Sequence, residues 1–190
     1  STEIAISTEQ EPKKWVIYAV RATGGGERYV VEKFAERLMD VHWSPDGNKI
    51  VYATLRYDEE TVGSEVKKHW FWDFNLINAD GSGDRYLLTL PGEDKNWRSI
   101  RWSPDSQWVA IYDCNQLGGT GGAQLILQNV NGGTLNYTIN QVLGAPFGPV
   151  WSYDRRKLLM NTMDGIYVSD LNGGNRYLLA PYAAIVGWLP

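Results

Sequence analysis

The chain has 190 residues, 43% of them hydrophobic, and its 18 basic and 22 acidic side chains give a formal net charge of −4. This length allows one sizeable core, and so mild a charge argues against the basic stripe that nucleic-acid-binding proteins usually carry. No apolar run reaches the roughly 18 residues of a membrane span, and the single cysteine, Cys114, cannot form a disulfide within the chain. We therefore expect a fold held by apolar burial, with no nucleic acid bound and no membrane insertion.

The predicted elements are short strands rich in Val, Ile, Leu, Tyr and Trp. In chain order they are residues 2–7, 15–20, 28–32, a strand ending at Trp43, 49–54, 72–78, 85–90, a strand ending at Trp102, 108–113, 124–130, 135–140, a strand ending at Trp151, 157–162, 166–171, 176–180 and 186–188. No convincing helix is present, and residues 33–40 (KFAERLMD) are expected to form at most one helical turn.

A tryptophan motif introduces each repeat of this pattern. Its copies are residues 41–47 (VHWSPDG), 100–106 (IRWSPDS), a degraded 150–155 (VWSYDR) and a truncated 186–190 (VGWLP). Pro and Asp favour a tight turn after the tryptophan, and Gly47 can adopt the positive φ that such a turn needs. We expect Trp43, Trp102 and Trp151 to pack between adjacent sheets.

A glycine turn lies out of phase with the tryptophan motif. Its copies are residues 22–31, 79–88, 171–179 and a weaker 130–139. Each is an Asx/Gly turn between two β-prone runs, which indicates a hairpin. The two motifs together predict four strands in each unit.

The two chain ends complete a fourth unit, because the spacing from Trp188 through both termini to Trp43 equals that of an ordinary unit. Residues 2–7 would supply its second strand and residues 186–188 its first. Such sharing pairs strand edges that would otherwise stay open. We predict a single domain of four units, at about residues 2–45, 46–104, 105–153 and 154–190.

The turn residues and the repeated Arg-Tyr-Leu-Leu run resemble the TolB-type (WD40-like, PD40) β-propeller repeat over nearly the whole chain. The resemblance implies an all-β propeller of four four-stranded blades, with the terminal blade closed by the N- and C-terminal strands. Relatives of this type include periplasmic partner-binding proteins, propeller domains of serine peptidases and some lyases. A periplasmic or secreted bacterial protein is expected, and the cytoplasm stays open as an alternative.

Binding usually occurs in loops held on a rigid scaffold. The variable connections are predicted at residues 33–40, 55–69, 91–99, 115–123, 141–148 and 181–185. Trp97 beside Arg98 has the composition of an interface hot spot, although Trp97 could instead pack on a neighbouring blade. We predict a site for a protein or peptide partner at the central mouth, and Ala at both positions should abolish binding. The candidate residues are Asp94, Trp97, Arg98, Phe147, Tyr182, Arg37 and Phe34.

Residues 55–69 are expected to extend a hairpin, with its tip near residues 62–64. This hairpin would reach a partner or another subunit, or would be a solvated protrusion.

The chain carries no recognisable catalytic motif, and its two histidines, His42 and His69, offer no metal-binding spacing. We therefore expect no cofactor, no metal and no enzymatic activity. Two alternatives stay open. One is self-assembly, as half of an eight-bladed ring or as a fibre, and the other is a hydrolase or lyase that uses carboxylates in the central channel.

Overall fold

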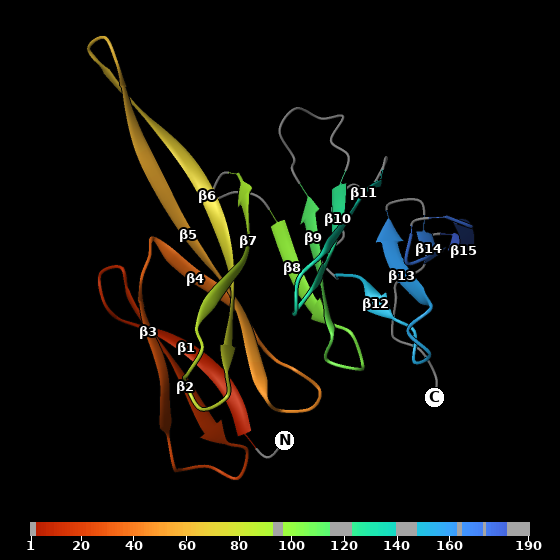
Figure 1. Ribbon diagram of the computed structural model, residues 1–190, viewed down its shortest axis with the longest axis horizontal. Helices are drawn as coiled ribbons and strands as arrows, with labels where there is room; N and C mark the ends of the chain where they lie inside the picture. Colours follow the sequence, from red (N-terminus) through yellow and green to blue (C-terminus); the bar gives the residue numbers. More distant parts are fainter. Residues whose placement is uncertain are drawn as a thin grey trace. The chain divides into compact units, whose positions relative to one another are not determined.

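A computed structural model describes residues 3–92, 97–114, 123–139, 148–162, 165–172 and 174–181. These residues form fifteen β-strands and no helix (Figure 1). No helix able to cross a membrane is therefore found in this part of the chain. The predicted all-β class and the repeated antiparallel sheet are confirmed. The chain divides into two compact units, residues 1–94 and 95–190, and each unit contains two sheets.

Unit 1 contains a three-stranded and a four-stranded sheet, in which each strand runs antiparallel to the next. The strands are β1 (Glu3–Glu11), β2 (Lys14–Arg21) and β3 (Arg28–Phe34), followed by β4 (Arg37–Trp43), β5 (Lys49–Val62), β6 (Glu65–Asn78) and β7 (Arg85–Pro91). β1 is at the edge of its sheet. The strand expected beside it, residues 186–188, lies outside the described residues.

Unit 2 contains two four-stranded antiparallel sheets. Their strands are β8 (Trp97–Trp102), β9 (Trp108–Cys114), β10 (Ala123–Asn129) and β11 (Thr134–Ile139), then β12 (Val150–Trp151), β13 (Lys157–Thr162), β14 (Gly165–Asp170) and β15 (Tyr177–Pro181). The predicted strands match these bounds to within a few residues, except at β5 and β6, which are much longer. The single-domain prediction stays a prediction.

A hydrogen-bonded Ser–Asp turn joins the first two strands of three sheets. In the first copy the Ser44 hydroxyl donates to the Asp46 carboxylate at 2.5 Å and accepts from the Lys49 amide at 2.9 Å. The Asn48 amide also donates to Asp46, at 3.0 Å. The same contacts recur around Ser103 and Asp105, and around Ser152 and Asp154. Each serine is buried, so the turn satisfies polar groups that water does not reach.

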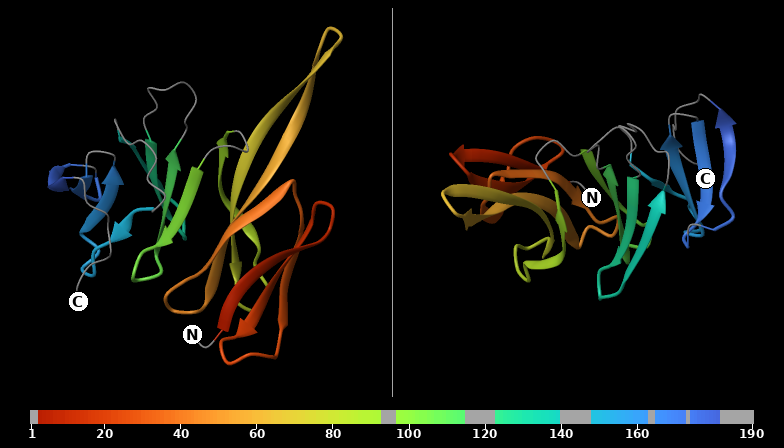
Figure 2. Two further views of the ribbon diagram at one scale, coloured as in Figure 1. Left: turned by 180° about the vertical axis from the view of Figure 1, so that it is seen from behind. Right: turned by 90° about the horizontal axis from the view of Figure 1, so that it is seen from above.

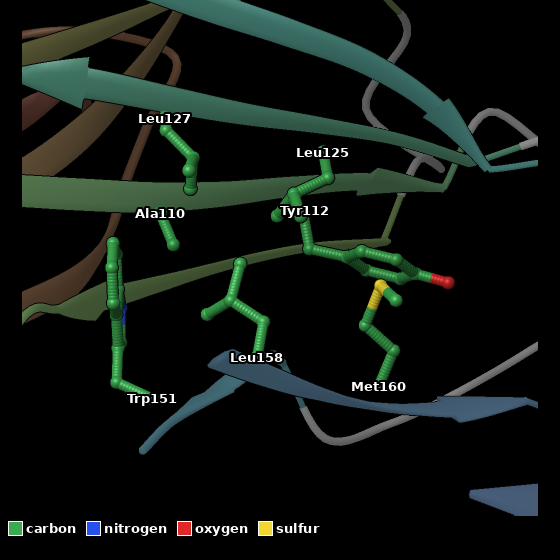
Figure 3. Close-up of a cluster of buried hydrophobic side chains, with 7 residues drawn as sticks. All are labelled: Ala110, Tyr112, Leu125, Leu127, Trp151, Leu158 and Met160. Carbon is green, nitrogen blue, oxygen red and sulfur yellow. The ribbon is translucent and has the colours of Figure 1, made fainter. Parts of the chain in front are cut away.

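Two of the motif tryptophans, Trp43 and Trp151, pack between sheets as predicted. In unit 1, Trp43 contacts a buried cluster that joins the sheet of β1–β3 to that of β4–β7. In unit 2, Trp151 is buried and its indole nitrogen donates to the Arg101 carbonyl at 3.4 Å. Figure 3 shows the side chains of this second cluster meeting between β9–β10 and β12–β13: Ala110, Tyr112, Leu125, Leu127, Trp151, Leu158 and Met160. Trp102 is buried as well.

Residues 33–40 are extended, so the helical turn considered for them is wrong. The Ala35 amide donates to the Lys13 carbonyl at 2.9 Å, and the Glu36 amide donates to the Leu55 carbonyl at 2.8 Å. These sheet-type bonds override the local helical preference. A bulge follows within β4, where Asp40 adopts a φ of 55°.

The predicted extension of the hairpin over residues 55–69 is confirmed. β5 and β6 pair without interruption from Lys49 and Asn78 to Val62 and Glu65. β4 pairs with β5 only as far as Leu55, and β7 pairs with β6 only as far as Phe71. The outer part of the hairpin is therefore a two-stranded ribbon that projects beyond the rest of unit 1 (Figures 1 and 2).

Candidate functional site

A groove of about 590 Å³ lies at the base of this ribbon. It is bordered by the β1–β2 turn, the β3–β4 connection and β5, and all of these lie in unit 1. Its lining consists of Pro12, Lys13, Phe34, Ala35, Glu36, Arg56, Tyr57 and Glu59. A smaller cavity of about 280 Å³ in unit 2 is lined largely by residues of the Ser–Asp turns, whose polar groups already bond within those turns. The groove is therefore the stronger candidate site.

The position of the groove follows from the unequal lengths of β4 and β5. β4 begins at Arg37, opposite Leu55, whereas β5 continues to Val62. The groove occupies the space beside β5 from which β4 is absent. The two amide bonds of Ala35 and Glu36 fix the connection at the mouth of this space, and there the Phe34 side chain is 76% exposed.

A lysine ion pair and an aromatic ring lie close together in the groove. Lys13 Nζ is 2.6 Å from Glu36 Oε1 and 5.8 Å from the centre of the Tyr57 ring. The hydrogen bond to Glu36 raises the pKa of Lys13 above its ordinary value. Tyr57 in turn packs on Trp70, with ring centres 4.9 Å apart. The lysine is therefore held as a cation beside a carboxylate and an aromatic face.

Arg56 is held by a network that reaches into the sheet. Its Nε donates to Asp73 Oδ2 at 2.7 Å, and its Nη1 donates to Asp58 Oδ1 at 2.9 Å. These bonds, that to Asp73 first, raise the pKa of Arg56. Asp73 is buried and accepts a further bond from Thr89 at 2.6 Å, and the guanidinium lies 4.7 Å from the centre of the Phe71 ring. Two carboxylates thus bind the arginine and compensate its charge.

The groove therefore combines exposed aromatic surface with paired charges. Each of its two cations contacts a carboxylate of the same unit. No group of three or more His, Cys, Asp or Glu side chains is placed to hold a metal ion within the described ranges. Such a surface suits a ligand with apolar side chains and backbone-type hydrogen-bonding groups.

The structure describes only some of the predicted site residues. Arg37 was expected in a loop but is the first residue of β4, next to the groove residue Glu36. Trp97 and Arg98 were also expected in a loop but begin β8, because their backbones pair with Cys114 and Asp113 of β9. The side chains of both, and the whole of Asp94, Phe147 and Tyr182, lie outside the described residues. The site predicted around them stays a prediction.

Of the aromatic residues named from the sequence, Phe34 does line the groove. Lys13 and Tyr57 were not anticipated, although alternation places Leu55, Tyr57 and Glu59 on one face of an extended β5. The predicted extension of the hairpin past Leu55 already implies this alternation, so Tyr57 could have been found from the sequence.

No protein-family model matches the chain, and no curated protein matches it. Several solved structures, in contrast, are similar to it. An oligogalacturonate lyase from Vibrio parahaemolyticus is 12% identical, with a TM-score of 0.59 over 93% of this chain and 45% of that one. An uncharacterized protein from Listeria monocytogenes is 13% identical, with a TM-score of 0.60 over 95% and 51%. The tricorn protease is 12% identical, with a TM-score of 0.52 over 93% and 20%.

These likenesses correct one prediction. The step from a missing catalytic motif to no enzymatic activity is overturned, because an oligogalacturonate lyase shares the fold and the lack of a familiar motif does not exclude activity. The chain spans about half the length of the first two solved structures. At such low identity the likenesses establish the fold alone, and this fold is of the β-propeller type, built from repeated antiparallel sheets.

Proposed function

We propose that this chain is a TolB-type propeller module that binds a protein partner through an extended peptide segment held in the groove of unit 1. The Ser–Asp turns that follow Trp43, Trp102 and Trp151 support the repeat type. The exposed Phe34 ring in the groove is the observation that carries the binding role. Large exposed aromatic side chains on a rigid scaffold are typical anchors of protein interfaces.

The charges of the groove support a peptide more than an acidic sugar. The lyase that shares the fold is named for oligogalacturonate, a chain of carboxylates. Lys13 and Arg56 are already paired with carboxylates, and Glu59 adds a further negative charge. An incoming polyanion would have to displace these bonds, whereas a peptide could bury apolar side chains on Phe34 without doing so.

A peptide library displayed on phage, with inserts of about ten residues, tests the proposal. A selected peptide is synthesised and its Kd is measured by calorimetry. We expect Phe34→Ser to weaken binding about tenfold or more, as for an anchor residue. Tyr153→Ser is the matched control, because Tyr153 is 78% exposed and lies in a turn of unit 2.

The outcomes separate the groove from the site predicted around Trp97. Unchanged affinity in Phe34→Ser, or a library without binders, would overturn the proposal. Loss of binding in a Trp97→Ala/Arg98→Ala protein, with Phe34→Ser unaffected, would assign the peptide to the other site.

A further inference from the structure

We infer that the partner segment binds as an additional β-strand on the open edge of β5, residues 56–62, and that this segment carries Lys or Arg side chains. The inference rests on the proposed function and specifies the kind of ligand.

Backbone groups of β5 point into the groove. Beyond Leu55, β5 pairs only with β6 among the described residues. The Leu55 carbonyl accepts from the Glu36 amide and so faces the side of β4. Backbone groups of successive residues alternate between the two sides of a strand. The N–H and C=O groups of Tyr57 and Glu59 therefore face that same side, where a further strand can bond to them.

The groove is aligned with this edge. Tyr57 and Glu59 line it from β5, and Ala35 and Glu36 line it where β4 begins. A strand that continues the line of β4 would pass through the groove and across Phe34. Strand addition of this kind gains main-chain hydrogen bonds, while pockets beside the edge select alternate side chains.

The charge of the edge indicates the chemistry of the segment. Asp58, Glu59 and Glu60 are consecutive, and each of their side chains is more than half exposed although it contacts Arg56, Lys68 or His69 respectively. Exposed ion pairs of this kind are weak, so these carboxylates can accept a further cation. Side chains directly opposite each other on paired strands interact, and opposite charges are favourable there. An added strand with Lys or Arg at these positions is therefore preferred over an acidic or uncharged one.

A second copy of this chain does not fit the edge. Pairing β5 with β5 of another copy would place acidic residues opposite each other, which is unfavourable. The outer part of β6 is basic, with Lys67 and Lys68, but stacking ribbons of successive copies side by side would separate the copies by about 10 Å. The sheet of β4–β7 is itself about 20 Å wide in that direction, so the copies would collide.

N-methylation of the selected peptide, one residue at a time, tests strand pairing on the unaltered protein. In an added strand only every second peptide N–H faces β5. We expect methylation to weaken binding about tenfold or more at alternate residues and to be tolerated at those between.

Two variants of the protein test strand pairing by removing or keeping the N–H of residue 59. Glu59→Pro removes the N–H that faces the open edge and leaves the bonds to β6 in place, whereas Glu59→Ala keeps the N–H. We expect Glu59→Pro to lose binding and Glu59→Ala to weaken it only severalfold, with thermal unfolding confirming that both variants fold.

The experiments distinguish failure of the proposed function from failure of strand addition. If no peptide depends on Phe34, the proposed function fails and this inference fails with it. If a peptide depends on Phe34 but shows no alternating methylation pattern, the groove stands and strand addition is overturned. Binders without Lys or Arg would overturn the charge preference. A concentration-dependent mass in light scattering that Glu59→Lys abolishes would assign the edge to a second copy and overturn the inference.

Discussion

Arg155 and Asp105 connect the turns of two successive sheets in unit 2. Nη1 of the arginine lies 2.7 Å from Oδ2 of the aspartate. Arg155 reaches this position from a φ of 62°, in the place that Gly47 occupies in the first turn. A residue in a sterically unfavourable backbone conformation therefore contributes a contact between sheets.

Replacing this arginine should have a small effect on stability. Arg155→Ala keeps the positive φ and removes the ion pair. Because the arginine side chain is about half exposed, we expect the free energy of unfolding to fall by less than about 1 kcal/mol. The loss should shrink in high salt. Urea denaturation at low and high ionic strength measures it, and a loss that salt does not change would contradict the ion-pair account.

The cost of a side chain at Gly47 should come from the backbone alone. This glycine has a φ of 73°, and a Cβ placed on it would have nothing within 4 Å. We expect Gly47→Ala to lower the free energy of unfolding by about 1 kcal/mol. Gly47→Asn should cost less, because Asn tolerates this conformation. Equal losses in both variants, measured by urea denaturation, would show that the backbone conformation is not the cause.

Gly81 provides the contrasting case. Its φ of 88° is similar, but a Cβ would lie 2.5 Å from the Val30 carbonyl oxygen. That oxygen belongs to β3 in the neighbouring sheet and cannot move cheaply. We expect Gly81→Ala to cost about 2 kcal/mol or more, clearly above Gly47→Ala. Similar unfolding midpoints for the two variants would mean that the sheets of unit 1 separate easily.

The Ser–Asp turns should make stability depend on acid pH. The Ser152 hydroxyl, and then the Arg156 amide, hold the pKa of Asp154 below its ordinary value of 3.8. A carboxylate whose pKa is lower in the folded state stabilises the fold above pH 3.8, and this contribution disappears as the pH falls through the folded-state pKa.

Asp154→Asn tests this dependence. The variant should be less stable than the wild type at neutral pH, and the difference should narrow at about pH 3 or below. Thermal unfolding across this range measures it, with Glu27→Gln as the control at an exposed carboxylate outside the Ser–Asp turns. A difference that stays constant with pH would contradict the assignment.

The repeated turns were predictable because their chemistry is local. Ser44 and Asp46 satisfy the turn within a few residues of chain, so the sequence pattern alone indicated the first two strands of each unit. The tryptophans were predictable for a related reason, since large apolar rings at a fixed place in a strand pack between sheets.

The groove was less predictable because it depends on where pairing stops. Residues 33–40 have a helical composition, but pairing with β2 and β5, together with the bonds of Ala35 to Lys13 and Glu36 to Leu55, makes them extended. The start of β8 at Trp97 likewise depends on pairing with Cys114. Contacts between distant residues decide strand ends, and no local pattern records them.

The three Ser–Asp turns have the sequences SPDGNK, SPDSQW and SYDRRK. Only serine and aspartate are common to all three, and the left-handed position is filled in turn by glycine, serine and arginine. Mutation could therefore erase proline and glycine from every copy while the hydrogen bonds persist. Ancestral repeats in such chains would be traced more reliably by Trp-Ser-x-Asp spacing than by the more conspicuous proline and glycine.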